Sequence, residues 1–206
     1  MPKGNYYIPE PNNEPVFSYA PGTSERDKLI ETLAKLKKEE QDIPMYIGGE
    51  EVRTGKKIKM SPPHEHKHTL GYFHEGDKTH VKKAIESAKS AKREWAALSW
   101  EHRASIFLKA ADLIAGPYRA QMNAATMLAQ SKNPFQSEID AVCEFIDFLR
   151  FNASYMQEVY MDQPESAPGT WNRLEYRPLE GFVLAITPFN FTSIAGNLPC
   201  APALMG

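Results

Sequence analysis

The sequence predicts an α/β protein in which helices and short hairpins precede one strand of a parallel sheet. Apolar residues recur at helical spacing through the middle of the chain. Two short β-prone runs flank Gly48 and Gly49, the pattern of a tight hairpin. The late run GFVLAITP is apolar throughout and bounded by glycine and proline, as in a strand buried on both faces of a parallel sheet. Since one strand cannot make such a sheet, we expect the chain to be incomplete.

The composition is that of an ordinary globular protein. The chain has 206 residues, of which 42% are hydrophobic and 24% charged, with a net charge of −2. This balance gives no reason to expect binding to nucleic acid or to a membrane surface. Two cysteines, Cys143 and Cys200, are too few for a disulfide framework and favour a reducing compartment. The first residues resemble neither a secretory signal nor a transit peptide.

Capping residues and apolar stripes predict the order of the elements. Residues 1–23 hold five prolines and are expected to form an extended arm that lies on another part of the protein. Ser24 and Asp77 are expected to cap helices. The run TLGYFHEGD predicts a strand, and RLEYRPLE alternates as an exposed strand does. The predicted helices span residues 24–41, 77–95, 100–115, 117–132 and 135–160.

The chemistry of the chain is concentrated where the apolar run ends, in the sequence ITPFNF. Asn190 follows the predicted strand, and in open α/β sheets ligands bind beyond the carboxyl ends of strands. Its neutral amide donor suits an oxyanion that develops during acyl chemistry. The simpler interpretation is that Asn190 only caps the following helix, since asparagine is a favoured N-cap.

The combination of ITPFNF with GNLPCAPALMG resembles the aldehyde dehydrogenase family. The stretches NEPVFSYAPGTSERDKL, RASIFLKAADLIAGP and AQSKNPFQSEIDAVCEFIDFLRFNASY extend the resemblance over nearly the whole chain. They are similar to the mitochondrial branch that oxidises L-glutamate γ-semialdehyde, the open form of Δ1-pyrroline-5-carboxylate, to L-glutamate. That resemblance implies NAD as cofactor, a role in proline breakdown and a location in the mitochondrial matrix.

The resemblance also implies a role for individual residues. Asn190 matches the asparagine that holds the oxygen of the reaction intermediates, and Phe191 matches an aromatic residue beside the aliphatic chain of the aldehyde. Glu144 matches a carboxylate at the substrate entrance. The strand end that lies along the nicotinamide ribose is matched by Ile186, Thr187, Pro188 and Phe189.

The same resemblance divides the chain into four segments. Residues 1–23 are the extended arm, and residues 24–152 are the N-terminal helical part of the NAD-binding domain. Residues 153–178 match an oligomerisation ribbon that crosses to a neighbouring subunit, which implies a homodimer or a higher homo-oligomer. Residues 179–206 are the truncated start of the Rossmann-like sheet.

The acidic residues around Glu144 leave alternatives open. Asp140 and Glu144 are one helical turn apart, and two like charges at that spacing destabilise a helix slightly. They are consistent with a substrate-facing role and equally with a solvated helix face. Glu138 is a competing candidate on the same predicted helix.

The nucleophile of this chemistry is not expected among these residues. The reaction requires a cysteine thiolate and a glutamate that activates water. Cys143 falls on an apolar helix face and is interpreted as a core thiol, and Cys200 as a packing residue. We therefore expect the chain alone to be inactive. The alternatives are a non-catalytic truncated paralogue that pairs with full-length subunits, and an aldehyde dehydrogenase of broader specificity.

Two further patterns are given the simpler interpretation. The run HEHKH places His64, His66 and His68 on one face of an extended segment, a spacing that could bind zinc, but a solvated turn is favoured and no metal site is assigned. Trp95, Trp100 and Phe107 are expected to belong to the core.

Overall fold

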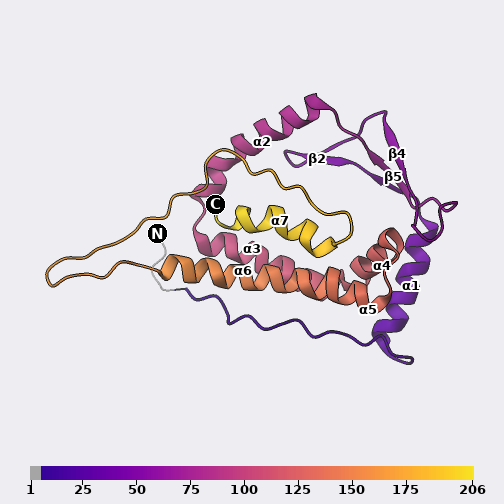
Figure 1. Cartoon of the computed structure of the whole chain (residues 1–206), viewed down its shortest axis with the longest axis horizontal. Coiled ribbons are helices and arrows are strands. Elements are labelled where there is room, and N and C mark those ends of the chain that lie inside the picture. The colour runs from indigo at the N-terminus through magenta and orange to yellow at the C-terminus, as the bar shows by residue number, and fades with distance from the viewer. Residues whose placement is uncertain (1–5) are drawn as a thin grey trace.

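The computed structural model describes residues 6–206 of the chain. Five short strands and a set of helices follow the arm (Figure 1). The elements are α1 (Ser24–Lys38), β1 (Gln41–Ile43), β2 (Met45–Ile47), β3 (Glu50–Val52), β4 (Lys57–Met60), β5 (Gly71–His74), α2 (Lys78–Ala97), α3 (Trp100–Ala115), α4 (Arg119–Gln130), α5 (Pro134–Ser137), the π-helical turn η1 (Glu138–Cys143), α6 (Glu144–Met161) and α7 (Thr192–Leu204).

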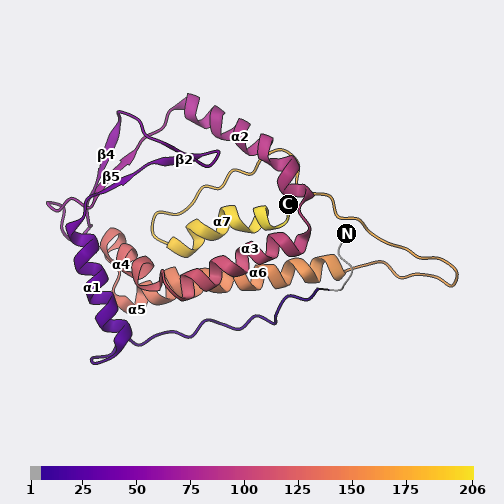
Figure 2. The same cartoon turned by 180° about the vertical axis from the view of Figure 1, so that it is seen from behind.

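The main core lies between α3, α6 and α7, which run side by side in both views (Figures 1 and 2). Ala111 of α3, Ile146 and Met156 of α6 and Leu204 of α7 are almost inaccessible to solvent. Burying one leucine, isoleucine or methionine side chain stabilises the fold by about 1.5–3 kcal/mol. The prediction that Phe107 is a core residue is confirmed, and Trp95 and Trp100 pack against the same cluster.

The strands form two small sheets rather than one large one. In the first, β5 lies between β1, to which it is parallel, and β4, to which it is antiparallel. In the second, β2 and β3 form the predicted hairpin. Gly48 and Gly49 both have positive φ, at 65° and 83°, so the turn uses the conformations that glycine adopts most easily. The strands β1 and β4 were not among the predicted elements: they span only three and four residues, although the residues of β4 alternate between polar and apolar.

The two predicted helix caps have different outcomes. Asp77 accepts hydrogen bonds from the backbone amides of Thr79, at 2.8 Å, and of His80, so the capping prediction is confirmed. The prediction for Ser24 is wrong, because Ser24 is the first residue of α1 and Thr23 holds the cap position. The Thr23 hydroxyl instead donates to the carbonyl of Ala20, which shapes the turn before the helix.

The predicted long helix over 135–160 is divided in three. It begins with α5, widens into η1 and continues as α6. A π turn inserts one extra residue without breaking the rod, so apolar spacing alone does not reveal it. The insertion changes the direction in which the side chains of η1 point from the helix axis, and these side chains include Glu138 and Asp140.

The arm lies along α6, on the side away from α7 (Figure 1). The amide of Ile8 donates to Gln157, and the amide of Glu14 donates to Asp147 at 2.7 Å. Residues 6–23 contain no helix or strand. Side chains of α6 satisfy these backbone amides of the arm in place of a neighbouring strand.

The strands predicted between residues 162 and 191 are not present in the structure. The runs RLEYRPLE and GFVLAITP contain no strand, and residues 153–161 belong to α6 rather than to a ribbon. Ile186 is 81% exposed. A strand requires a hydrogen-bonded neighbour, and no segment among residues 6–206 pairs with this one. The expected first strand of the buried sheet is thus an exposed, extended segment.

None of the helices in the described part of the chain combines the length and the apolar character that crossing a membrane would require.

Candidate functional site

Asn190 lies immediately before the amino end of α7. Phe191, and not Asn190, occupies the cap position of this helix, with the extended backbone φ of −133°. The interpretation of Asn190 as a helix cap is therefore wrong. No hydrogen bond joins its side chain to another residue in 6–206, and the neighbouring Phe189 is 93% exposed. The amide of Asn190 is accessible at a helix end that carries a partial positive charge.

Polar contacts from two other helices fix where α7 begins. The hydroxyl of Thr192 lies 3.0 Å from that of Thr126 and accepts a hydrogen bond from Gln130, both on α4. The buried Ser193 donates a hydrogen bond to the Glu144 carboxylate at the start of α6. These three contacts hold the first turn of α7, and with it the residues that precede the helix.

Phe191 is contacted by a cation. The ammonium of Lys132 lies 4.3 Å from the centre of its ring. The same ammonium lies 3.2 Å from a carboxylate oxygen of Asp140 in η1. A cation over an aromatic face contributes about 0.5–2 kcal/mol, depending on how far it is removed from water.

The small residues of α7 allow it to lie close to α6. A Cβ atom added to Gly196 would overlap the ring of Phe145. At the next residue of α7, the side chain of Asn197 accepts a 2.8 Å hydrogen bond from Asn152 of α6. The helix α7 is therefore closely packed, and its partner at this point is an aromatic ring of α6.

Glu144 and Asp140 face a groove that contains a cavity of about 600 Å³. The groove lies between the arm, η1, α6 and α7, and both carboxylates line it together with Asp147. Each of the three has a partner: Ser193 for Glu144, Lys132 for Asp140, and the arm for Asp147. The extra residue in η1 therefore does not hide the two acids that were singled out from the sequence.

Glu138 is removed from the candidates, because its side chain is fully buried. Burial alone raises the pKa of this carboxyl. Hydrogen bonds from Arg119, the Phe17 amide, Tyr19 and Asn123 outweigh that effect and bring the pKa below its usual range. Glu138 is the centre of a structural ion pair with Arg119, which also binds Glu14 of the arm.

The two thiols are poor nucleophiles in this environment. Burial, reinforced by the negative charge of Glu138, raises the pKa of Cys143 to about 12. Burial also raises the pKa of Cys200. Both groups are therefore protonated near neutral pH, in agreement with their interpretation as packing residues.

The histidine run forms a turn. The Nδ1 atom of His64 lies 2.7 Å from the hydroxyl of Ser131, and Glu65 forms an ion pair with Lys37. Two backbone hydrogen bonds, from Glu65 to Pro62 and from His68 to Glu65, close the turn. Among residues 6–206 no three potential ligands come together in a metal-binding arrangement.

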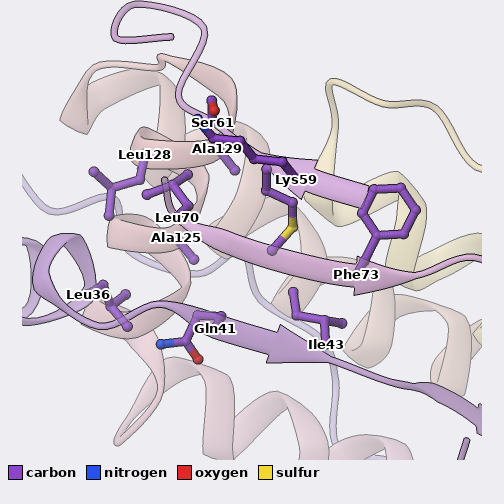
Figure 3. A pocket seen from close by; sticks show the side chains of 11 residues that line it. Leu36, Gln41, Ile43, Lys59, Ser61, Leu70, Phe73, Ala125, Leu128 and Ala129 are labelled. Atoms are coloured by element: carbon purple, nitrogen blue, oxygen red, sulfur yellow. The ribbon is translucent and has the colours of Figure 1, made fainter. Parts of the chain in front are cut away.

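A second cavity, of about 440 Å³, lies between the three-stranded sheet and the helices α1 and α4 (Figure 3). Its lining is mainly apolar and includes the paired residues Ile43 and Phe73 and, on α4, Leu128. No titratable cluster converges on it: the one charged lining residue is Lys59. The groove beside Glu144 is the better candidate for chemistry.

The structure brings only part of the predicted site together. Glu144 and Phe191 meet at the first turn of α7, Glu144 through its bond with Ser193 and Phe191 as the cap residue, and Pro188 is half-buried. Ile186, Thr187, Phe189 and Asn190 are exposed. Lys132 and Ser193 were missed by sequence reasoning, because neither lies in a local pattern that marks a site.

Comparison with known proteins identifies the family of the chain. The model of the aldehyde dehydrogenase family matches residues 51–206. A Δ1-pyrroline-5-carboxylate dehydrogenase of Agaricus bisporus is 53% identical over 203 residues, 98% of this chain and 37% of that protein. The human mitochondrial enzyme of the same name is 49% identical over 194 residues, covering 94% of this chain and 34% of its own length.

Solved structures agree in fold. The Δ1-pyrroline-5-carboxylate dehydrogenase of Mycobacterium tuberculosis, bound with NAD, superposes with a TM-score of 0.97 at 52% identity, over 99% of this chain and 38% of that one. A mutant of the 1-pyrroline-5-carboxylate dehydrogenase of Thermus thermophilus gives 0.84 at 27% identity, over 97% and 39%. The chain thus spans little more than a third of the relatives it matches. It carries an N-terminal part of their α/β fold and belongs to the aldehyde dehydrogenase family.

Proposed function

We propose that this chain is the N-terminal part of an NAD-dependent dehydrogenase that oxidises L-glutamate γ-semialdehyde, the open form of Δ1-pyrroline-5-carboxylate, to L-glutamate. The observation that carries the proposal is the accessible Asn190 amide, held at the amino end of α7 by the contacts of Thr192 and Ser193. The names of the relatives from Agaricus bisporus and human support the choice of substrate.

Asn190 is proposed to stabilise the oxygen of the reacting aldehyde. Attack on an aldehyde carbon converts its carbonyl oxygen to an oxyanion, which needs a hydrogen-bond donor that is already in place. The amide of Asn190 donates without changing its own charge, and the positive end of α7 lies beside it. Removing one such donor typically lowers kcat by about 100- to 1,000-fold.

Phe191 and Glu144 are proposed to shape the substrate path. The half-buried Phe191 ring offers an apolar face to the aliphatic part of the aldehyde. Glu144 lines the groove near the start of α7 and presents a carboxylate to the incoming molecule. An amino-acid aldehyde carries an ammonium group, so a carboxylate at the entrance would attract it by charge.

Ile186, Thr187, Pro188 and Phe189 are proposed to contact NAD. Ile186, Thr187 and Phe189 are exposed and lie directly before Asn190, so their accessible surface fits a ribose that lies alongside the oxyanion site. NAD, when bound, accepts the hydride from the former aldehyde carbon. The residues of this chain would orient that carbon, through Asn190 at its oxygen and Phe191 along its chain.

The nucleophile must come from elsewhere in the complete protein. Both cysteines of the chain have a raised pKa, and Cys143 is enclosed beside Glu138. Catalysis by a thiolate therefore needs a residue outside this sequence, and the chain alone is proposed to be inactive.

We also propose an oligomer and a mitochondrial location for the complete protein. Residues 162–191 present large apolar side chains to solvent, among them Trp171 at 82% exposure. A neighbouring subunit that pairs with the extended segment 162–178 would cover part of this surface. The relatives from Dictyostelium discoideum and human are named as mitochondrial, which supports a mitochondrial location.

The test is to follow NADH formation from Δ1-pyrroline-5-carboxylate, with this chain and with the protein encoded by its complete natural reading frame. Activity of the complete protein alone supports the proposal. Equal efficiency with simple aliphatic aldehydes would favour a broad-specificity enzyme. Inactivity of both, with no further cysteine encoded downstream, would replace the proposal with a non-catalytic paralogue.

A further inference from the structure

Lys132 connects three parts of the fold that meet at the candidate site. It lies in the short connection between α4 and α5, directly after Ser131, whose φ of 57° is left-handed. The left-handed backbone at Ser131 ends α4, so Lys132 does not continue that helix. The Lys132 side chain is only 13% exposed, so its charge is largely removed from water.

A shielded ammonium needs partners, and Lys132 has two of different kinds. One is the carboxylate of Asp140 in η1, at 3.2 Å. The other is the ring of Phe191, whose centre lies 4.3 Å away. Asp140 balances the charge, and the ring faces the same cation. The ammonium therefore links η1 to the residue that directly follows Asn190.

A second contact holds the same turn from the opposite end. Ser193 donates to Glu144, which follows η1 in the chain. Phe191 and Ser193 flank Thr192, so both neighbours of that residue are held by acidic groups of the η1–α6 segment. Phe191 is held through Lys132, and Ser193 directly.

We propose that Lys132 is a positioning residue, which holds the Phe191 ring and thereby the turn that presents Asn190. The role assigned to that turn rests on the function proposed above. In this account the ammonium does not bind the substrate, because Asp140 and the ring of Phe191 already occupy it.

The first test measures backbone hydrogen exchange in the complete protein and needs no catalysis. The amide of Ala195 donates to the carbonyl of Phe191 at 3.0 Å, so its hydrogen exchange reports on the turn. The substitution Lys132→Met keeps the length of the side chain and removes the charge. We expect exchange at Ala195 to become about tenfold faster, and Lys132→Arg to restore most of the protection.

Lys83→Met is the matched control, because Lys83 is an exposed lysine of α2. It should leave exchange at Ala195 unchanged, and none of the variants should alter the exchange of α3 amides. Unchanged protection at Ala195 in Lys132→Met would overturn the proposal. A general increase throughout the chain would overturn it as well, since it would show a global loss of stability.

The second test uses the complete protein and separates positioning from substrate binding. With Lys132→Met, kcat should fall by a similar factor for the semialdehyde and for uncharged propanal, with little change in KM. A rise in KM confined to the semialdehyde would show that Lys132 binds the charged end of the substrate, and would overturn the proposal. If the complete wild-type protein is inactive, the proposed function fails, while the exchange at Ala195 still decides whether Lys132 positions the turn.

Discussion

Ser193 donates its hydroxyl hydrogen to the carboxylate of Glu144, and this bond joins the first turn of α7 to the first turn of α6. Ser193 is fully buried and Glu144 is half-buried, so little water can replace either partner. This contact therefore links Glu144, the residue matched to the substrate entrance, directly to α7, the helix that follows Asn190.

Replacing Ser193 with alanine should destabilise the chain by about 1.5–3 kcal/mol, the range for hydrogen bonds to charged groups. The free energy of unfolding in urea measures the effect. Ser90→Ala, at an exposed position of α2, is the control and should change stability by less than about 0.5 kcal/mol. An equal effect of the two substitutions would show that the bond to Glu144 contributes nothing.

Glu138 should make stability depend on pH. Its pKa is below the usual range in the folded chain, because the hydrogen bonds from Arg119 and its other neighbours outweigh the effect of burial. The carboxylate therefore stabilises the fold above its unfolded pKa of about 4.3, and this contribution is lost as the pH falls through the lower folded value.

Glu138→Gln should remove that part of the pH dependence and leave the buried Arg119 with Glu14 as its remaining anionic partner. Breaking a buried ion pair typically costs about 3–5 kcal/mol near neutral pH, and the remaining Glu14 should keep the loss near the lower end of that range. Urea unfolding at a series of pH values measures both effects. A stability profile of Glu138→Gln parallel to that of the wild type would contradict the assignment, and the exposed Glu86→Gln provides the comparison.

Gly196→Ala should destabilise the contact between α7 and α6. The new methyl group would overlap the Phe145 ring, and overpacking of this kind typically costs about 1–3 kcal/mol. Gly55→Ala is the control, because nothing lies near its added Cβ. Adding Phe145→Leu to Gly196→Ala should recover part of the loss in thermal unfolding. No recovery would mean that the ring is not the obstacle.

Cys143 should resist alkylation in the folded chain. Burial raises its pKa to about 12, so the thiolate is scarce near neutral pH and also enclosed. Mass spectrometry after brief iodoacetamide treatment should find Cys143 unmodified, and modified once the chain is unfolded in urea. Rapid modification of the folded chain would contradict the interpretation of Cys143 as a core thiol.

Local sequence signals predicted much of the fold. The capping of α2 by Asp77 and the glycine turn between β2 and β3 depend on a few adjacent residues, and both were found where the pattern placed them. The predicted strand at 181–188 depends on a neighbour, and none of the described residues supplies one. The apolar run indicates a segment suited to a buried strand, but without a neighbouring strand among residues 6–206 it remains extended and unpaired.

The site shows the same division. Asn190, Phe191 and Glu144 were singled out from a motif and a resemblance. The role of Glu138 depends on the arm, which is far from it in sequence, and on Arg119. Lys132 meets Phe191 only because η1 and α7 fold against each other. Contacts between distant segments leave no local periodicity, so sequence reasoning missed them.

The role of Asn190 is tested by kcat for Δ1-pyrroline-5-carboxylate and NAD in the complete protein, with Asn190→Ala compared with the wild type. We expect kcat to fall about 100-fold or more, the typical effect of losing one oxyanion donor. Asn12→Ala, at an exposed position of the arm, should leave kcat unchanged. An unchanged kcat in Asn190→Ala would contradict the role of Asn190 in holding the oxyanion.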